Sequence, residues 1–151
     1  MERDCRHLES LLYRDIPITQ ALGLQVKSWE AHSLRLHAPL DANVNHAHTM
    51  FGGSLYCIAV LAGWGWLYLR LREAGLEEEG QIVIQEGQIA YPLPVTTDAI
   101  ALCDAPDERD WQRFETMFRR RGRGRLTLHS RILAANGEDG VRFTGQYVLH
   151  K

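Results

Sequence analysis

The sequence predicts an α+β domain in which a curved antiparallel sheet wraps around one long apolar helix. The segment Thr49–Leu69 has no charged residue and opens with a glycine pair, so it is typical of a helix that is apolar on every side. Alternating polar and apolar residues before and after this segment indicate strands of a half-buried sheet. The length of 151 residues suits one domain, which we place at residues 1–151. We expect the helix to be almost wholly buried in the assembled protein.

The apolar segment could instead cross a membrane, since about 20 apolar residues span a bilayer. Arg70 and Arg72 follow it and would suit the positive flank of such a span. The segment is rich in glycine, however, and the residues after it indicate β-structure rather than a second span. The charged residues 1–10 lack the apolar core of a signal peptide. We therefore expect a core helix in a cytoplasmic protein, without a membrane span.

Hydrophobic periodicity places the other elements. An amphipathic helix is expected at residues 2–14, ending before Pro17, and a hairpin at residues 24–29 and 33–40. The central helix should run to about Ala74 and stop at Gly75. An antiparallel meander should follow, with strands at 81–95 (bulged at Gly87), 98–104, 124–134 and 141–149. A second helix at 108–121 has an apolar stripe that should pack on the sheet.

Composition excludes several functions. The formal net charge of -2 gives no general attraction to nucleic acid or acidic lipid. Cys5, Cys57 and Cys103 are scattered without metal-ligand spacing, which indicates reduced thiols in the cytoplasm. Asp41, His46 and His48 do not have the spacing of a metal site, so we expect none.

The glycine pair Gly52-Gly53 is the first candidate for chemistry. The first turn of a helix leaves backbone N–H groups free at the positive end of its dipole. Glycines have no Cβ, so a ligand can approach these amides closely, and they could stabilise negative charge that builds on a carbonyl oxygen. The alternative is that the glycines only allow the helix to pack tightly on the sheet.

Polar side chains crowd the loop before this helix: Asn43, Asn45, His46, His48 and Thr49. An Asn could orient a water or a carbonyl, and a His could act as a general base near neutral pH. Thr49 or Ser54 could instead cap the helix, and the other residues could simply satisfy backbone groups of the loop.

The segment Asn43–Leu55 resembles the Asn-x-x-Gly-Thr-x-Phe-Gly-Gly segment of hotdog-fold acyl-CoA thioesterases. Ala90–Val95 is similar to the strand that follows the central helix in those proteins. Trp111–Phe114 and Phe143–Val148 resemble one branch, whose thioesterase-like domains occur alone or fused behind an N-acetyltransferase domain. The resemblance covers residues 15–150. It implies a homodimer or a dimer of dimers, with acyl thioesters bound between protomers and no cofactor beyond the coenzyme A moiety of the substrate.

The resemblance also suggests site residues. Asn45 falls on the family's loop Asn, and Gly53 lies near the amide that polarises the thioester carbonyl. We predict catalytic roles for Asn45, His46, His48 and Gly53. We predict substrate contacts for Thr49, Phe51, Gly52, Ser54, Arg121 and Arg123.

Two departures from the family pattern affect the mechanism. Residues 56–62 contain no acid where many hotdog thioesterases carry an Asp or Glu, and His48 replaces a glycine. Either His46 or His48 is then the base, or Glu86 or Asp98 reaches the site. Otherwise the domain is a module that binds acyl thioesters or a partner protein without hydrolysing them. A hotdog dehydratase would need a His paired with a helical acid, and only the His is present.

Residues 119–125 contain five arginines, including Arg121 and Arg123. Arginine forks match phosphate oxygens, so the run could bind the phosphates of coenzyme A. Gly-Arg repeats can also bind RNA, but no aromatic residues are interleaved here and we expect no nucleic-acid partner. The third interpretation is a solvated basic edge.

Overall fold

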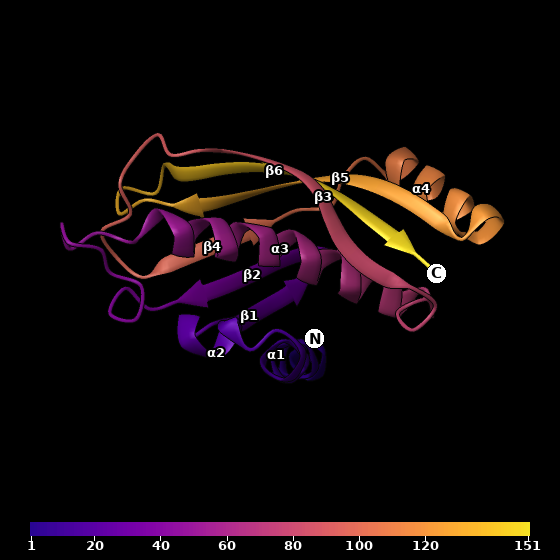
Figure 1. Cartoon of the computed structure of the whole chain (residues 1–151), viewed down its shortest axis with the longest axis horizontal. Helices are drawn as coiled ribbons and strands as arrows, with labels where there is room; N and C mark the ends of the chain where they lie inside the picture. The colour runs from indigo at the N-terminus through magenta and orange to yellow at the C-terminus, as the bar shows by residue number, and fades with distance from the viewer.

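The computed structural model describes all residues, 1–151, as one six-stranded antiparallel sheet that curves around a long helix. In Figure 1, the helix α3 (Gly52–Glu73) lies along one face of the sheet. Helices α1 (Glu2–Asp15) and α2 (Ile18–Leu22) lie at the bottom of the view, and α4 (Glu108–Arg121) lies at the upper right. This confirms the predicted α+β class and the hotdog arrangement of a curved sheet around a central helix.

The predicted helices are present as α1 (Glu2–Asp15), α3 and α4 (Glu108–Arg121). Gly75 has a φ of 71°, which fits a stop just after α3. A short helix, α2 (Ile18–Leu22), was not predicted. It begins directly after Pro17 and ends at Gly23, whose φ of 66° suits glycine. Its five residues are too few to show a helical period in the sequence.

The strands are β1 (Gln25–Glu30), β2 (Ser33–Ala38), β3 (Gln81–Ala90), β4 (Ala99–Cys103), β5 (Arg123–Leu133) and β6 (Asp139–His150). Their order across the sheet is β1-β2-β4-β5-β6-β3, so the expected meander is wrong. β3 pairs with β6 at the far edge, and β4 returns to the middle beside β2. Residues 91–98 contain Pro92 and Pro94 and form a long connection across the sheet instead of a hairpin turn.

The bulge in β3 is at Gln85, not at the predicted Gly87, because the register shifts between Ile84 and Glu86. Gly87 pairs with Gly145 on the side that faces α3. A Cβ at Gly87 would collide with the Tyr56 hydroxyl and the Phe143 ring. This glycine therefore serves close packing rather than a change of register.

Two hydroxyl groups fix the middle of α3 to the sheet. Ser130 Oγ donates to the carbonyl of Ala59 at 2.8 Å, and Tyr147 OH donates to the carbonyl of Val60 at 2.7 Å. Burial raises the pKa of the Tyr147 phenol, which keeps it a neutral donor. A side chain at Gly63 would collide with this phenol. β5 and β6 therefore cross α3 at residues 59 and 60, which sets the position of its first turn.

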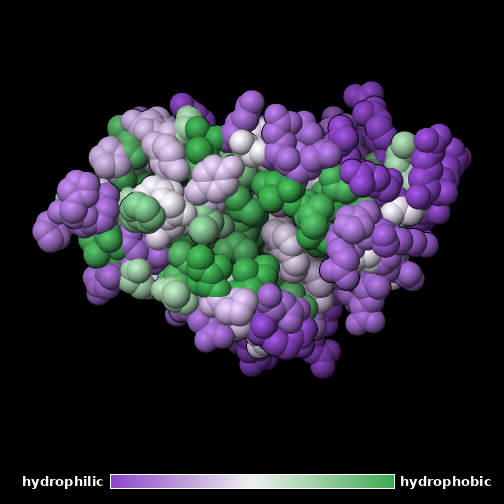
Figure 2. Space-filling model, viewed as in Figure 1, coloured by the Kyte–Doolittle hydropathy of each residue, from purple (hydrophilic) through white to green (hydrophobic).

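The sheet covers only one side of α3. Two thirds (67%) of the most apolar 18-residue window of this helix is buried, although its length and composition would allow a membrane span. Tyr56, Cys57, Val60 and Trp64 are only partly buried and follow one another along the helix. Figure 2 shows hydrophobic side chains gathered in the middle of this face. One chain alone thus leaves part of its central helix uncovered.

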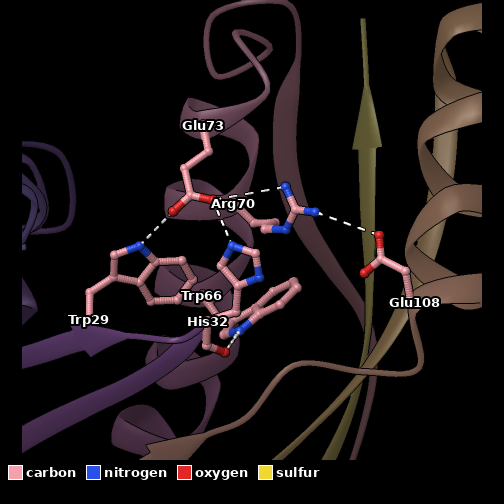
Figure 3. A network of polar contacts seen from close by, with 6 residues as sticks. All are labelled: Trp29, His32, Trp66, Arg70, Glu73 and Glu108. Atoms are coloured by element: carbon pink, nitrogen blue, oxygen red, sulfur yellow. Dashed lines mark hydrogen bonds and ion pairs between the residues drawn. The ribbon is translucent and has the colours of Figure 1, made fainter.

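A polar network locks the other end of α3 (Figure 3). The Glu73 carboxylate accepts from Trp29 Nε1 at 2.9 Å, pairs with His32 Nε2 at 2.8 Å and lies 3.9 Å from Arg70. Arg70 also lies 3.9 Å from Glu108 and 4.4 Å from the centre of the Trp111 ring. The network ties α3 to the β1–β2 hairpin and to α4.

Candidate active site

The N-terminus of α3 presents free backbone donors. Phe51 occupies the N-cap position with an extended backbone, and no side chain caps this end, so neither Thr49 nor Ser54 has the predicted capping role. No protein acceptor takes the N–H groups of Gly52, Gly53 or Ser54; the first helical hydrogen bond runs from Leu55 to Phe51. These donors lie at the positive end of a 22-residue helix and suit an oxygen that gains negative charge.

Aromatic rings flank the two glycines. A side chain at Gly53 would collide with the Phe51 ring, which is 55% exposed and lies against this residue. At Gly52 the nearest side chain is Tyr91, whose ring would be 3.7 Å from an added Cβ. The glycines therefore allow close approach to the helix terminus, and the Phe51 ring forms one wall beside it.

Asn45 organises the loop before the helix. Its Oδ1 accepts from the N–H groups of Ala47 at 2.8 Å and Thr49 at 3.1 Å. Its Nδ2 donates to Thr49 Oγ1 at 2.8 Å, and its backbone N–H donates to the Thr49 carbonyl at 2.8 Å. The amide oxygen is therefore committed to the loop, while one Nδ2–H is left for a ligand.

His48 has a φ of 61°, in the left-handed region that favours glycine. This conformation follows from the closed loop, in which the His48 N–H donates to the Asn45 carbonyl at 3.1 Å. A glycine would adopt this conformation without strain. His46 and His48 are both exposed, and neither imidazole has a hydrogen-bond partner in the chain. The loop thus holds two free imidazoles near the helix terminus.

Asn43 is a structural residue of the same loop. Its side chain is 4% exposed, and Nδ2 donates to the carbonyls of Leu22 at 2.9 Å and Pro39 at 2.8 Å. Its own carbonyl accepts from the Phe51 N–H at 2.7 Å. Both Nδ2 hydrogens are used, so Asn43 ties the loop to the body and has no donor left for a substrate.

Tyr91 is a site neighbour that the sequence patterns did not single out. Its hydroxyl donates to the Gly52 carbonyl at 3.0 Å. Burial raises the pKa of this phenol, and the nearby Tyr56 and Cys57 add to the effect. Tyr91, Tyr56 and Cys57 thus gather beside the first turn of α3. The only sequence signal was the resemblance of Ala90–Val95 to a family strand.

The two alternative carboxylates lie elsewhere. Glu86 pairs in register with Gln146, on the face of the sheet opposite Tyr147 and α3. Asp98 accepts from the Leu40 N–H at 2.9 Å and contacts His37 Nε2 at 3.1 Å. The Leu40 N–H, followed by His37, lowers the pKa of Asp98, so this carboxylate fixes the chain before the loop. Within one chain, neither acid faces the glycine amides.

Arg121 and Arg123 lie at the opposite end of the protomer. Ser130 contacts Ala59, and Arg123 is seven residues before Ser130 on β5, which places it about 23 Å away along the strand. In Figure 1, α3 and β5 run in opposite directions, so this end of β5 lies far from the start of α3. One chain therefore does not bring these arginines and the glycine pair together. No group of three or more His, Cys, Asp or Glu side chains could hold a metal ion.

Comparison with known proteins identifies the family and the fold. Residues 5–151 match the family YiiD_C, described as "Putative thioesterase (yiiD_Cterm)". A protein of unknown function from Chlorobaculum tepidum TLS is 35% identical, with a TM-score of 0.91, covering 97% of this chain and 94% of that one. A structure described as "the putative thioesterase from Shewanella oneidensis" is 27% identical, with a TM-score of 0.85 and 100% of each chain covered.

A more distant structure shares the fold. The thioesterase HI1161 from Haemophilus influenzae is 14% identical, with a TM-score of 0.71 over 97% of this chain and 90% of that one. Its likeness is evidence for the hotdog fold alone. Because the family match covers nearly the whole chain, the protein belongs to the YiiD_C family of thioesterases, whose substrate these comparisons do not specify.

Proposed function

We propose that the protein hydrolyses an acyl-CoA or a related acyl thioester at the N-terminus of α3. The observation that carries this proposal is the set of uncapped amides at Gly52, Gly53 and Ser54. The thioester carbonyl would accept from the Gly53 amide, and the negative charge of the tetrahedral intermediate would be stabilised there. Asn45 would offer its remaining Nδ2–H to the carbonyl or to the attacking water.

His46 or His48 would act as the general base that activates the water. A base must reach the proton it removes, and both imidazoles are free on a loop that ends at the helix terminus. Thr49 shapes the loop through Asn45, while Phe51, Gly52 and Ser54 would line the approach to the carbonyl. The thiol of coenzyme A would leave protonated, with the imidazolium as the proton donor.

We infer that two copies of the chain complete the site. β3 is an edge strand with Val83 44% exposed and Ile84 39% exposed, and its outer backbone has no partner. If two β3 strands paired antiparallel about their middle, each partner's Gln81 end would lie beside the Ala90 end of this chain. The partner's α4 would then approach the glycine pair, and its basic C-terminus would be available for the phosphates of coenzyme A. The three free cysteines are consistent with a cytoplasmic location.

The alternative is a module that binds acyl thioesters without hydrolysing them. It is favoured by one observation: neither Glu86 nor Asp98 faces the amides, and the first turns of α3 carry no acid. Release of free thiol from a panel of acyl-CoAs separates the two functions. Hydrolysis above the uncatalysed rate supports the enzyme, whereas binding of coenzyme A conjugates without hydrolysis supports the module.

Variants of the loop test the catalytic roles. Asn45→Ala should lower kcat by about 10²–10³, the usual cost of losing one oxyanion donor. Asn45→Asp keeps both acceptor contacts of Oδ1 and removes the Nδ2 donor, so it separates the chemical role from loop shape. His46→Ala tests the first imidazole.

His48 needs a matched pair of variants, because its backbone is strained. His48→Ala removes the imidazole and keeps a non-glycine residue at φ 61°, whereas His48→Gly removes the imidazole and the strain together. If His48 is the base, both variants lose activity equally. If only His48→Ala loses activity, the position matters for loop shape, and if neither His46 nor His48 variants lose activity, histidine is not the base.

A further inference from the structure

A groove lies on the outer face of the sheet, the face turned away from α3. It encloses about 620 Å³, within the range of small-molecule sites. Its floor is formed by β5 and β6, and its sides by residues 104–106 after β4 and residues 88–90 of β3. The candidate active site is on the other face, so this groove contains none of the proposed catalytic residues.

Two arginines face each other in the floor of this groove. Arg131 of β5 and Arg142 of β6 are register partners, so their side chains emerge side by side. Like charges in directly opposed positions destabilise a sheet. One carboxylate, Asp139, forms an ion pair with each of them: it lies 3.6 Å from Arg131 and 3.8 Å from Arg142. Both separations exceed hydrogen-bond length, so two guanidinium forks keep their donors for another oxyanion.

The rest of the groove is polar with small apolar surfaces. His129 Nδ1 contacts Thr144 Oγ1 at 2.9 Å, which leaves Nε2 free, and Gln88 is the register partner of Thr144 with no bond to its side chain. Asp104 accepts from Ser33 Oγ at 2.6 Å at one side. Leu102 and Pro106 add apolar contact. This lining suits a ligand with a strongly acidic end and a polar body.

We propose that the groove binds a small organic phosphate, with the phosphate oxygens shared by Arg131 and Arg142. A phosphate offers several acceptor oxygens and more than one negative charge, which matches two adjacent forks better than a single carboxylate does. The body of the ligand lies toward His129, Thr144 and Gln88. The phosphate belongs either to the nucleotide end of a substrate thioester, in place of the partner's α4 suggested above, or to a separate phosphorylated effector. Ala90 at the rim directly precedes Tyr91, which contacts Gly52, so the groove begins close to the candidate active site.

Direct binding tests the proposal without reference to activity. Adenosine 3′,5′-bisphosphate and inorganic pyrophosphate are titrated into the full chain by calorimetry in phosphate-free buffer. Arg131→Gln and Arg142→Gln should each weaken binding by at least about tenfold, as expected for a lost charge-assisted hydrogen bond. Arg142→Lys, which keeps the charge but not the fork, should retain part of the affinity. Arg113→Gln, on exposed α4, is the matched control and should bind as the unchanged chain does.

Kinetics then identifies the source of the phosphate. If the groove holds the nucleotide end of the substrate, the two Gln variants raise KM for an acyl-CoA and leave KM unchanged for the same acyl group on N-acetylcysteamine. If it holds an effector, probe binding is lost while both KM values stay the same. The proposal is overturned if the unchanged chain binds neither probe, or if all variants bind equally while circular dichroism shows them folded. A chain that binds the probes but hydrolyses no thioester contradicts only the proposed function.

Discussion

The two edge strands of the sheet, β1 and β3, differ in how far the rest of the chain covers them. The β1 edge is short, and α1 packs beside it. Glu9 of α1 accepts the Val26 N–H at 2.9 Å, and Tyr13 donates to the Leu24 carbonyl at 2.6 Å. The β3 edge is ten residues long, none of them is buried, and no side chain bonds to its outer backbone. Proteins normally protect a long apolar edge because it pairs with other chains.

This difference supports the proposal that two copies of the chain assemble through the β3 edge. The β1 edge is covered by α1 and by the Glu9 carboxylate, whereas no segment of the chain covers the β3 edge. The exposed Val83 and Ile84 of β3, with the uncovered strip of α3, form the natural surface for a second copy. The candidate active site lies at the Ala90 end of this same edge, so assembly and catalysis would be linked.

The largest expected effect comes from a charge on the open edge. Ile84→Lys places two lysines near the two-fold axis of a β3–β3 dimer, where each must be desolvated. We expect the dissociation constant of the dimer to rise by at least about a hundredfold, which corresponds to roughly 2.7 kcal/mol. Sedimentation equilibrium measures this change.

Ile18→Lys is the control for Ile84→Lys. Ile18 is 53% exposed on α2, which packs with α1 on the β1 side of the sheet, and this variant should assemble as the unchanged chain does. A dimer that survives Ile84→Lys would show that copies meet through another surface. A chain that is monomeric before substitution would remove the assembly proposal altogether.

The contrast between the edges also shows what the sequence could predict. The apolar period of the helices and the alternation in β2, β5 and β6 are local patterns, and they located these elements to within a few residues. The position of β3 was missed, because alternation reports which face of a strand is apolar and does not report its neighbour. Only the two prolines between β3 and β4 hinted that no tight hairpin joins them.

The candidate active site was likewise predictable in part: residue types could be read from the sequence, but their contacts could not. The glycine pair and the loop residues could be selected because chemistry and spacing are visible in the sequence. The different roles of Asn43 and Asn45 could not be predicted from the sequence. Only the folded loop decides which side-chain amide is buried and which keeps a free N–H. Arg121 and Arg123 of the 119–125 run were assigned to the substrate from their chemistry alone, because arginine forks match phosphate oxygens. The fold places Arg123 on the far end of β5.

A smaller effect is expected at the protected edge. Glu9→Ala leaves the Val26 N–H without its acceptor and should lower the free energy of unfolding by about 1 kcal/mol, the net value of one hydrogen bond. Urea denaturation measures the loss. Glu9→Gln keeps an acceptor oxygen and should cost clearly less. If both variants were as stable as the unchanged chain, the carboxylate would not protect this edge.

The smallest effect concerns the turn that closes the β1–β2 hairpin. Ala31 and His32 both have left-handed backbones, with φ of 50° and 56°, where a two-residue hairpin turn prefers Asn-Gly. His32 keeps its place because its carbonyl accepts from Trp66 Nε1 at 2.7 Å and its ring pairs with Glu73 (Figure 3). Ala31 has no such compensation.

Ala31→Asn should therefore raise the free energy of unfolding by about 0.5–1 kcal/mol, by relieving strain in the folded state. Thermal denaturation should show a higher Tm, while the proposed dimer, which would depend on the opposite edge, should stay unchanged. An unchanged or lower Tm would mean that the network around Glu73, rather than local backbone preference, already sets the stability of this hairpin.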